Sequence, residues 1–233
     1  MKALIFDTGP VISLTLNNLL WLLEPLYEKF HGNFYITQSV YEELIDKPLS
    51  TRKYKFEALQ VLPFITKGIL KTIKDEQITQ IAKKLLDKAN NTFKADGNWI
   101  KIVHSGEIET IATALYLQST TIVIDERTGR MLIEDPESIA TTLSMKLHTK
   151  IEINQANLDY IKKELSGLKV IRSAELVSVA YKLGLLDRYL LQDEKKIIKD
   201  LDKAVLEGAL WGIKLNGCSI SRDEIYKVIK ILA

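Results

Sequence analysis

The sequence predicts an α/β fold with a central, mainly parallel sheet, followed by an all-helical C-terminal region. Short apolar runs alternate with segments of helical periodicity through residues 1–153. From residue 154 onward the strand signals stop, while helical stripes continue along the chain. This change of pattern predicts two parts, an α/β part at 1–153 and a helical part at 154–233.

The first strand is expected at 3–6, Ala-Leu-Ile-Phe. A short apolar run that leads into a Gly-Pro turn is typical of a buried central strand covered on both faces. Leucines with helical spacing follow at 11–30, and His31-Gly32-Asn33 ends that predicted helix. A second strand is expected at 34–36, with Thr37 or Ser39 as the cap of the next helix.

The alternation then continues along the chain. The further expected elements are a helix at 54–62, a strand at 69–73, a helix capped by Asp75, an edge strand or ordered loop at 99–103, a helix from about Ser105, a strand at 121–124, a mostly helical segment at 127–147 and a last strand at 150–153. In the C-terminal part, helical stripes run through 176–183 and 197–209, and Ser221 to Glu224 form a capping box that opens a final helix.

Composition indicates an ordinary globular protein. Hydrophobic residues make up 46% of the 233 residues and charged residues 27%, so disorder is not expected over most of the chain. The formal charge of +2 neither demands nor excludes a polyanionic partner. The single cysteine, Cys218, excludes an internal disulfide and favours a reducing compartment. We find no signal-peptide pattern and no bilayer-spanning stretch, and we therefore expect a cytoplasmic protein without a membrane association.

Asp7 is the first candidate site residue, because a carboxylate directly after a buried strand has little structural reason to be there. The other candidate acids are Glu42-Glu43 in the second predicted helix, Glu107 to Glu109 at the start of a later helix, and Asp125-Glu126 after the strand at 121–124. All but one of them lie where a strand ends or a helix begins. Parallel connections bring strand ends that are distant in sequence to one edge of the sheet. A cluster of carboxylates there suits Mg²⁺ or Mn²⁺. Taken alone, the glutamates also fit solvated helix surface, and Glu107 also fits a stabilised first helical turn.

The order of the acidic motifs resembles that of PIN-domain nucleases. The resemblance rests on A-L-I-F-D-T-G-P-V-I-S-L at 3–14, Y-I-T-Q-S-V-Y-E-E-L at 35–44, S-G-E-I-E-T-I-A-T-A at 105–114 and I-V-I-D-E-R-T-G-R at 122–130. It covers roughly residues 1–153, and four motifs in one order are far more specific than any single motif. The chain looks like a VapC-like or archaeal-type PIN protein with a C-terminal helical extension, which implies a three-layer α/β/α fold.

Matched motif by motif, the resemblance implies Asp7, Glu43 and Glu107 as catalytic and metal-binding acids. The fourth acid falls on Asp125 or Glu126, because the common Thr-x-Asp form reads Ile-Asp-Glu here. Most members have Asp where this chain has Glu107. Thr8 and Glu109 are expected to border the site.

The family implies a Mg²⁺- or Mn²⁺-dependent endoribonuclease, in which carboxylates hold ions that lower the pKa of a bound water. The alternative is a catalytically weak PIN-like RNA-binding or assembly subunit. The expected partners are RNA, an antitoxin-like protein and a second copy in a homodimer. Candidate RNA contacts are Arg52, Lys53, Arg127 and Arg130, each of which also fits solvated surface. Asp-Thr-Gly also occurs in aspartic proteases, but those are all-β chains that need two such loops.

Overall fold

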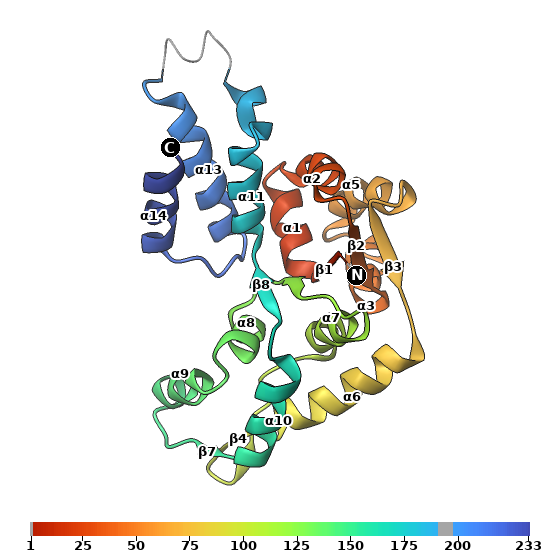
Figure 1. Cartoon of the computed structure of the whole chain (residues 1–233), viewed down its shortest axis with the longest axis vertical. Coiled ribbons are helices and arrows are strands. Elements are labelled where there is room, and N and C mark those ends of the chain that lie inside the picture. The colour runs from red at the N-terminus through yellow and green to blue at the C-terminus, as the bar shows by residue number, and fades with distance from the viewer. Residues whose placement is uncertain (1, 191–197) are drawn as a thin grey trace.

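The computed structural model describes residues 2–190 and 198–233. Within these residues, a five-stranded sheet has the order β3-β2-β1-β6-β8 (Figure 1), and every pair in it is parallel. Its strands are β1 (Ala3–Phe6), β2 (Asn33–Thr37), β3 (Leu70–Ile73), β6 (Thr121–Val123) and β8 (Lys169–Ile171). Because all strands run the same way, their carboxyl ends lie at one edge of the sheet.

Helices cover both faces of this sheet. Alternate residues of β1 point to opposite sides, so Leu4 and Phe6 join one apolar core while Ala3 and Ile5 join the other. The first core is covered by α1 (Thr8–Leu16), η1 (Leu20–Leu22), α2 (Leu23–Phe30), α3 (Gln38–Tyr41), η2 (Glu42–Asp46), α4 (Lys47–Ser50), α5 (Lys55–Thr66), α11 (Ser173–Lys182), η3 (Leu185–Tyr189), α13 (Leu201–Leu215) and α14 (Arg222–Leu232). The second is covered by α6 (Glu76–Asn90), α7 (Ser105–Tyr116), α8 (Arg127–Glu134), α9 (Ser138–Leu147) and α10 (Gln155–Leu165). The predicted α/β class with a mainly parallel sheet is confirmed.

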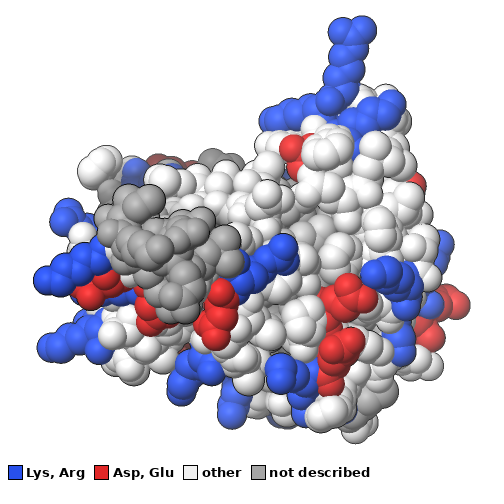
Figure 2. Space-filling model, turned by 90° about the horizontal axis from the view of Figure 1, so that it is seen from above, with Lys and Arg blue, Asp and Glu red and all other residues white. Residues whose placement is uncertain are grey.

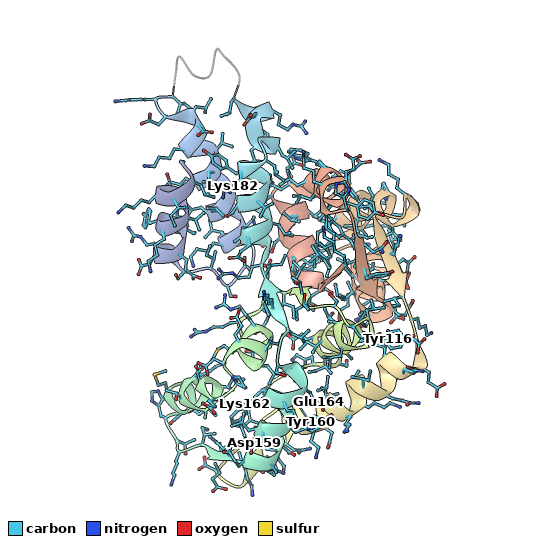
Figure 3. The ribbon with its side chains drawn as sticks, in the orientation of Figure 1. Tyr116, Asp159, Tyr160, Lys162, Glu164 and Lys182 are labelled. Carbon is cyan, nitrogen blue, oxygen red and sulfur yellow. The ribbon has the colours of Figure 1, made fainter. Side chains whose placement is uncertain are left out.

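Side-chain caps begin several of these helices. Asp75 accepts a hydrogen bond from the Gln77 amide at 2.8 Å and caps α6, as the sequence predicts. The Tyr116 hydroxyl at the end of α7 donates to the same carboxylate at 3.0 Å and joins the two helices (Figure 3). Of the two caps considered after β2, Thr37 is the one used, because its hydroxyl accepts from the Val40 amide at 3.2 Å.

The predicted single helix at 11–30 is wrong, since the chain breaks after α1. Asn18 adopts a left-handed conformation with φ of 60°, and η1 then leads into α2. Asparagine tolerates this conformation better than most residues, and the Asn17-Asn18 pair interrupts the leucine stripe. The break turns the chain so that α2 packs on the sheet separately from α1.

Two strand predictions need correction. Residues 152–153 form β7, which pairs antiparallel with β4 (Phe93–Ala95) in a small sheet that also contains β5 (Asn98–Trp99), and not in the central sheet. The region predicted as all-helical supplies β8, which pairs with β6 through Val170 and Ile122. The sequence signal of β8 is weak because only the pair Val170-Ile171 is apolar and Ser166, Gly167 and Lys169 precede it.

The helical character of the C-terminal region is otherwise confirmed. α11, α13 and α14 lie together beside α1 (Figure 1), and their buried leucines and isoleucines extend the first core. The predicted stripe at 197–209 corresponds to α13, which begins at Leu201, and Ile197 lies outside the described residues. No helix in the described ranges is both long and apolar enough to cross a membrane.

Candidate metal and active site

The carboxyl ends of three strands bring the acidic motifs together. Asp7 follows β1, Asp125 and Glu126 lie just beyond β6, and Ser173 lies just beyond β8. β6 pairs with both β1 and β8, so these segments are neighbours at one edge of the sheet. The topology therefore produces the convergence that the alternating pattern predicts.

A pocket of about 460 Å³ lies at this edge. Its lining contains every acid that the motifs single out except Glu42 and Glu109. The lining residues are Asp7, Thr8, Gly9, Ile12, Ser13, Glu43, His104, Gly106, Glu107, Asp125, Glu126, Asn216 and Gly217. No Lys or Arg belongs to this lining, and His104, its one basic side chain, lowers the pKa of Glu107.

Asp7 is buried at the N-terminus of α1. The pKa of its carboxyl is raised from 3.8 to about 7, mainly by burial and also by the charges of Glu107 and Glu43, against the opposing effect of the Thr8 and Gly9 amides. Desolvation favours the neutral acid, whereas a cation in the pocket would favour the carboxylate. Asp7 is therefore a buried acid that lacks a counter-charge in the described protein.

Glu43 reaches the pocket from the π-helical turn η2. Such turns are rare and are often found at functional sites. Its Oε2 accepts a hydrogen bond of 2.7 Å from the Thr8 hydroxyl, which connects the motif after β1 to the motif after β2. Lys47 lies 3.7 Å from Oε1, but both side chains of this ion pair are well exposed and the interaction is weak.

Glu107 enters from the first turn of α7. Burial raises the pKa of its carboxyl, the His104 amide lowers it, and the charges of Glu126 and Glu43 raise it. The amide contact is a hydrogen bond of 3.1 Å to Oε2, which caps α7. The glutamate therefore has both roles that the sequence left open, since it stabilises a helix start and faces the pocket.

Asp125 and Glu126 have different surroundings. Both carboxylate oxygens of Asp125 accept hydrogen bonds from Ser173, one from the amide and one from the hydroxyl, each 2.7 Å long. Glu126 is exposed, caps α8 through the Gly129 amide at 2.7 Å, and raises the pKa of Glu107. Of the two, Glu126 is the one whose charge acts on the acidic cluster.

The other predicted site residues lie outside the pocket lining. Glu109 accepts a hydrogen bond from the Ser39 hydroxyl. Arg52 and Lys53 are exposed between α4 and α5, and Arg127 is exposed at the start of α8. Arg130 pairs with Glu134 at 3.3 Å and donates to the Ser219 carbonyl at 3.4 Å, so its guanidinium contacts protein groups.

Three residues of the lining lie outside the recognised motifs: His104, Asn216 and Gly217. His104 directly precedes the motif at 105–114, and this position could have indicated it, while Ser13 lies within the motif at 3–14 but was not predicted as a site residue. Asn216 and Gly217 belong to the turn between α13 and α14, and only the folded structure brings them to the pocket. In the sequence, Asn216-Gly217 indicates only the end of a helix and does not indicate a binding site.

The chemistry of the lining fits Mg²⁺ or Mn²⁺, because carboxylate oxygens are the ligands such hard cations prefer. In the described residues, however, no three His, Cys, Asp or Glu side chains already form a group that could hold one ion. Binding therefore requires the glutamates to turn toward Asp7. Glu43 is suited to this movement because 42% of its side chain is exposed.

A family model described as a PIN domain matches residues 3–142 of this chain. No curated protein and no solved structure matches. The matched residues contain Asp7, Glu43, Glu107, Asp125 and Glu126, and they end before β8 and the C-terminal helices.

Proposed function

The chain belongs to the PIN-domain family, and from this premise we propose that it is an endoribonuclease that cleaves RNA with Mg²⁺ or Mn²⁺. PIN domains are in general nucleases, and the fold of this chain is of that type. The observation that carries the proposal is a single pocket lined by the family's acids with no Lys or Arg among the lining residues. Such a pocket attracts a divalent cation and, through the cation, a phosphate.

In the proposed mechanism Asp7, Glu43 and Glu107 would hold the ion, with Glu126 as the fourth acid. A bound ion would lower the pKa of a water and neutralise charge on the scissile phosphate. The Thr8 hydroxyl orients Glu43 through its 2.7 Å hydrogen bond. Asp7, whose pKa is raised to about 7, would have to lose its proton to act as a ligand.

The RNA itself needs contacts beyond the acids, which repel its phosphates. Tyr54 and Glu43 line the same small cavity next to the acidic pocket, so the segment with Arg52, Lys53 and Tyr54 adjoins the site. Tyr54 is 40% exposed and can stack on a base, while Lys53 lies over its ring at 4.8 Å. We therefore propose that the RNA contacts the few cations of this segment, next to the pocket. On another view of the molecule, Figure 2 shows positive and negative side chains interspersed, with an uncharged area between them.

The test is cleavage of a single-stranded RNA of mixed sequence by the full chain with Mn²⁺. We expect Glu107→Gln to reduce the cleavage rate at least about a hundredfold, the scale on which transition-state charge stabilisation operates. Glu164→Gln is the matched control, because Glu164 is exposed on α10 and does not line the pocket. Cleavage that persists in excess EDTA, or in Glu107→Gln at the wild-type rate, would refute the proposal.

The second candidate function is a PIN-like RNA-binding or assembly subunit with little catalysis. The observation that favours it is the engagement of Glu107, Asp125 and Glu126 in caps of α7, α11 and α8. RNA binding without metal-dependent cleavage would support this function over the first. The homodimer and the antitoxin-like partner stay predictions.

A further inference from the structure

Asp125 is oriented toward the C-terminal helices. It is 2% exposed, and its two carboxylate oxygens contact Ser173 at the N-terminus of α11. A carboxylate in this place is stabilised by the amide and by the dipole of the helix. Its charge acts on the buried thiol of Cys218, whose pKa is raised to about 12 by burial and then by Asp125.

The backbone of Asp125 holds the turn between α13 and α14. Its carbonyl accepts a hydrogen bond of 3.0 Å from the Ser219 amide. Arg172, which is 8% exposed, donates to the Ser219 carbonyl at 3.0 Å and pairs with Glu224 at 3.0 Å. We call Asp125, Arg172, Ser173 and Ser219 the Asp125 anchor, because together they fasten α11 and the α13–α14 turn to the end of β6.

The anchored turn forms one wall of the acidic pocket. Asn216 and Gly217 are exposed and contribute to the lining. The other side of the turn is fixed to the end of α1 by two hydrogen bonds. The Ser13 hydroxyl donates to the Asn216 carbonyl at 3.3 Å, and the side-chain Nδ2 of Asn216 donates to Asn17 Oδ1 at 3.2 Å. The turn is thus held between α1 and the Asp125 anchor. The pocket lining that it completes contains no Lys or Arg.

We propose that Asp125 is a positioning residue and not an ion ligand. It sets the wall formed by Asn216 and Gly217, so that the C-terminal helical region determines how an RNA strand enters the pocket. The inference rests on the proposed function and extends it to residues 173–233, which lie beyond the matched family segment. It assigns ion binding to Asp7, Glu43 and Glu107, and strand binding to the wall.

The experiment compares Mn²⁺ affinity, measured by calorimetry, with the affinity for a single-stranded RNA in Ca²⁺, measured by fluorescence anisotropy. Ser173→Ala breaks the side-chain half of the anchor, and Asn216→Ala removes the wall side chain. Each should weaken RNA binding roughly tenfold, which corresponds to about 1.4 kcal/mol. Their Mn²⁺ dissociation constants should stay within about twofold of wild type, since a twofold change corresponds to about 0.4 kcal/mol. Ser178→Ala, a serine substitution elsewhere on α11, is the matched control.

Asp125→Asn separates the two roles of the carboxylate. The asparagine oxygen can accept from the Ser173 amide, and its amide group can donate to the Ser173 hydroxyl, so the anchor is retained while the charge is lost. We expect unchanged Mn²⁺ affinity in this variant. A large loss of Mn²⁺ affinity in Asp125→Asn, or unchanged RNA affinity in both Ser173→Ala and Asn216→Ala, overturns the inference.

These readouts distinguish this inference from the proposed function. If the wild-type chain binds RNA and Mn²⁺ but cleaves nothing, the proposed endoribonuclease function is refuted, while the RNA affinities of the variants still decide the role of the wall. If the wild-type chain cleaves RNA and the variants Ser173→Ala and Asn216→Ala bind RNA as tightly as the wild type, only the proposed role of the wall is refuted. Ser173→Ala is also followed by circular dichroism, and if it fails to fold, the exposed Asn216→Ala decides the outcome.

Discussion

Replacing Asp7 with asparagine should stabilise the fold above neutral pH. The pKa of Asp7 is raised from 3.8 to about 7, first by burial and then by Glu107 and Glu43. At about 1.4 kcal/mol for each pH unit, ionising this group in the folded protein costs up to roughly 4 kcal/mol. Asparagine fills nearly the same volume and keeps an acceptor oxygen, but it carries no charge. Asp7→Asn should therefore raise the free energy of unfolding by about that amount at pH 8.

The sign of the pH dependence follows from linkage. Below about pH 4 Asp7 is protonated in both the folded and the unfolded chain, so its ionisation does not affect the comparison. Between about pH 4 and pH 7 the unfolded chain loses this proton while the folded chain keeps it, and the wild type loses stability relative to Asp7→Asn. Above about pH 7 the proton is lost in both states and the difference between the two proteins stays constant.

The assay is urea unfolding in EDTA at several pH values from 4 to 8, followed by circular dichroism. Asp159→Asn is the matched control, because Asp159 is exposed on α10, where its carboxylate accepts a hydrogen bond from the Gln155 side chain (Figure 3). The reasoning is refuted if the difference between Asp7→Asn and wild type is independent of pH, or if it shrinks as the pH rises from 4 to 7.

Further predictions concern the α1–α13 contact, the ion and the anchor. A methyl group on Gly212 would lie 2.2 Å from Asn17 Oδ1, so Gly212→Ala should destabilise the chain. A methyl group on Gly208 of the same helix would have no described atom of another segment within 4 Å, so Gly208→Ala should stabilise the chain by roughly 0.5–1 kcal/mol. Thermal unfolding compares the two variants. Mn²⁺ affinity should rise up to about tenfold for each pH unit between pH 5.5 and 7, because binding displaces the Asp7 proton; calorimetry that finds no pH dependence contradicts this. Arg172→Met should cost about 2 kcal/mol of unfolding free energy, because it removes the 3.0 Å hydrogen bond to the Ser219 carbonyl and the ion pair with Glu224, and denaturant unfolding measures the loss.

Much of the central fold followed from short apolar runs and their spacing. β1, β2, β3 and β6 lie where the pattern predicts them, because central strands buried on both faces must be apolar along their length. β8 did not have this signature. It is an edge strand in the sheet order, covered only partly, and it pairs through three residues. Its place in the sheet depends on tertiary contacts that no local pattern encodes.

The candidate site was predictable to a similar extent. Asp7 and the acids of the later motifs were found because each follows a strand or begins a helix, and the parallel topology brings them together. The distinct orientation of Asp125 was not predictable, since Ser173 is separated from it by 48 positions. The Asn216-Gly217 wall was missed for the same reason, because it reaches the pocket only after α13 packs on α1.

The most direct test of the account is calorimetric titration of Mn²⁺ into the metal-free chain at pH 7.5. We predict that the wild type binds Mn²⁺, that Asp7→Asn loses this binding, and that Asp159→Asn retains it. Binding of undiminished affinity in Asp7→Asn would contradict the assignment of the acidic pocket as the metal site, and with it the proposed chemistry.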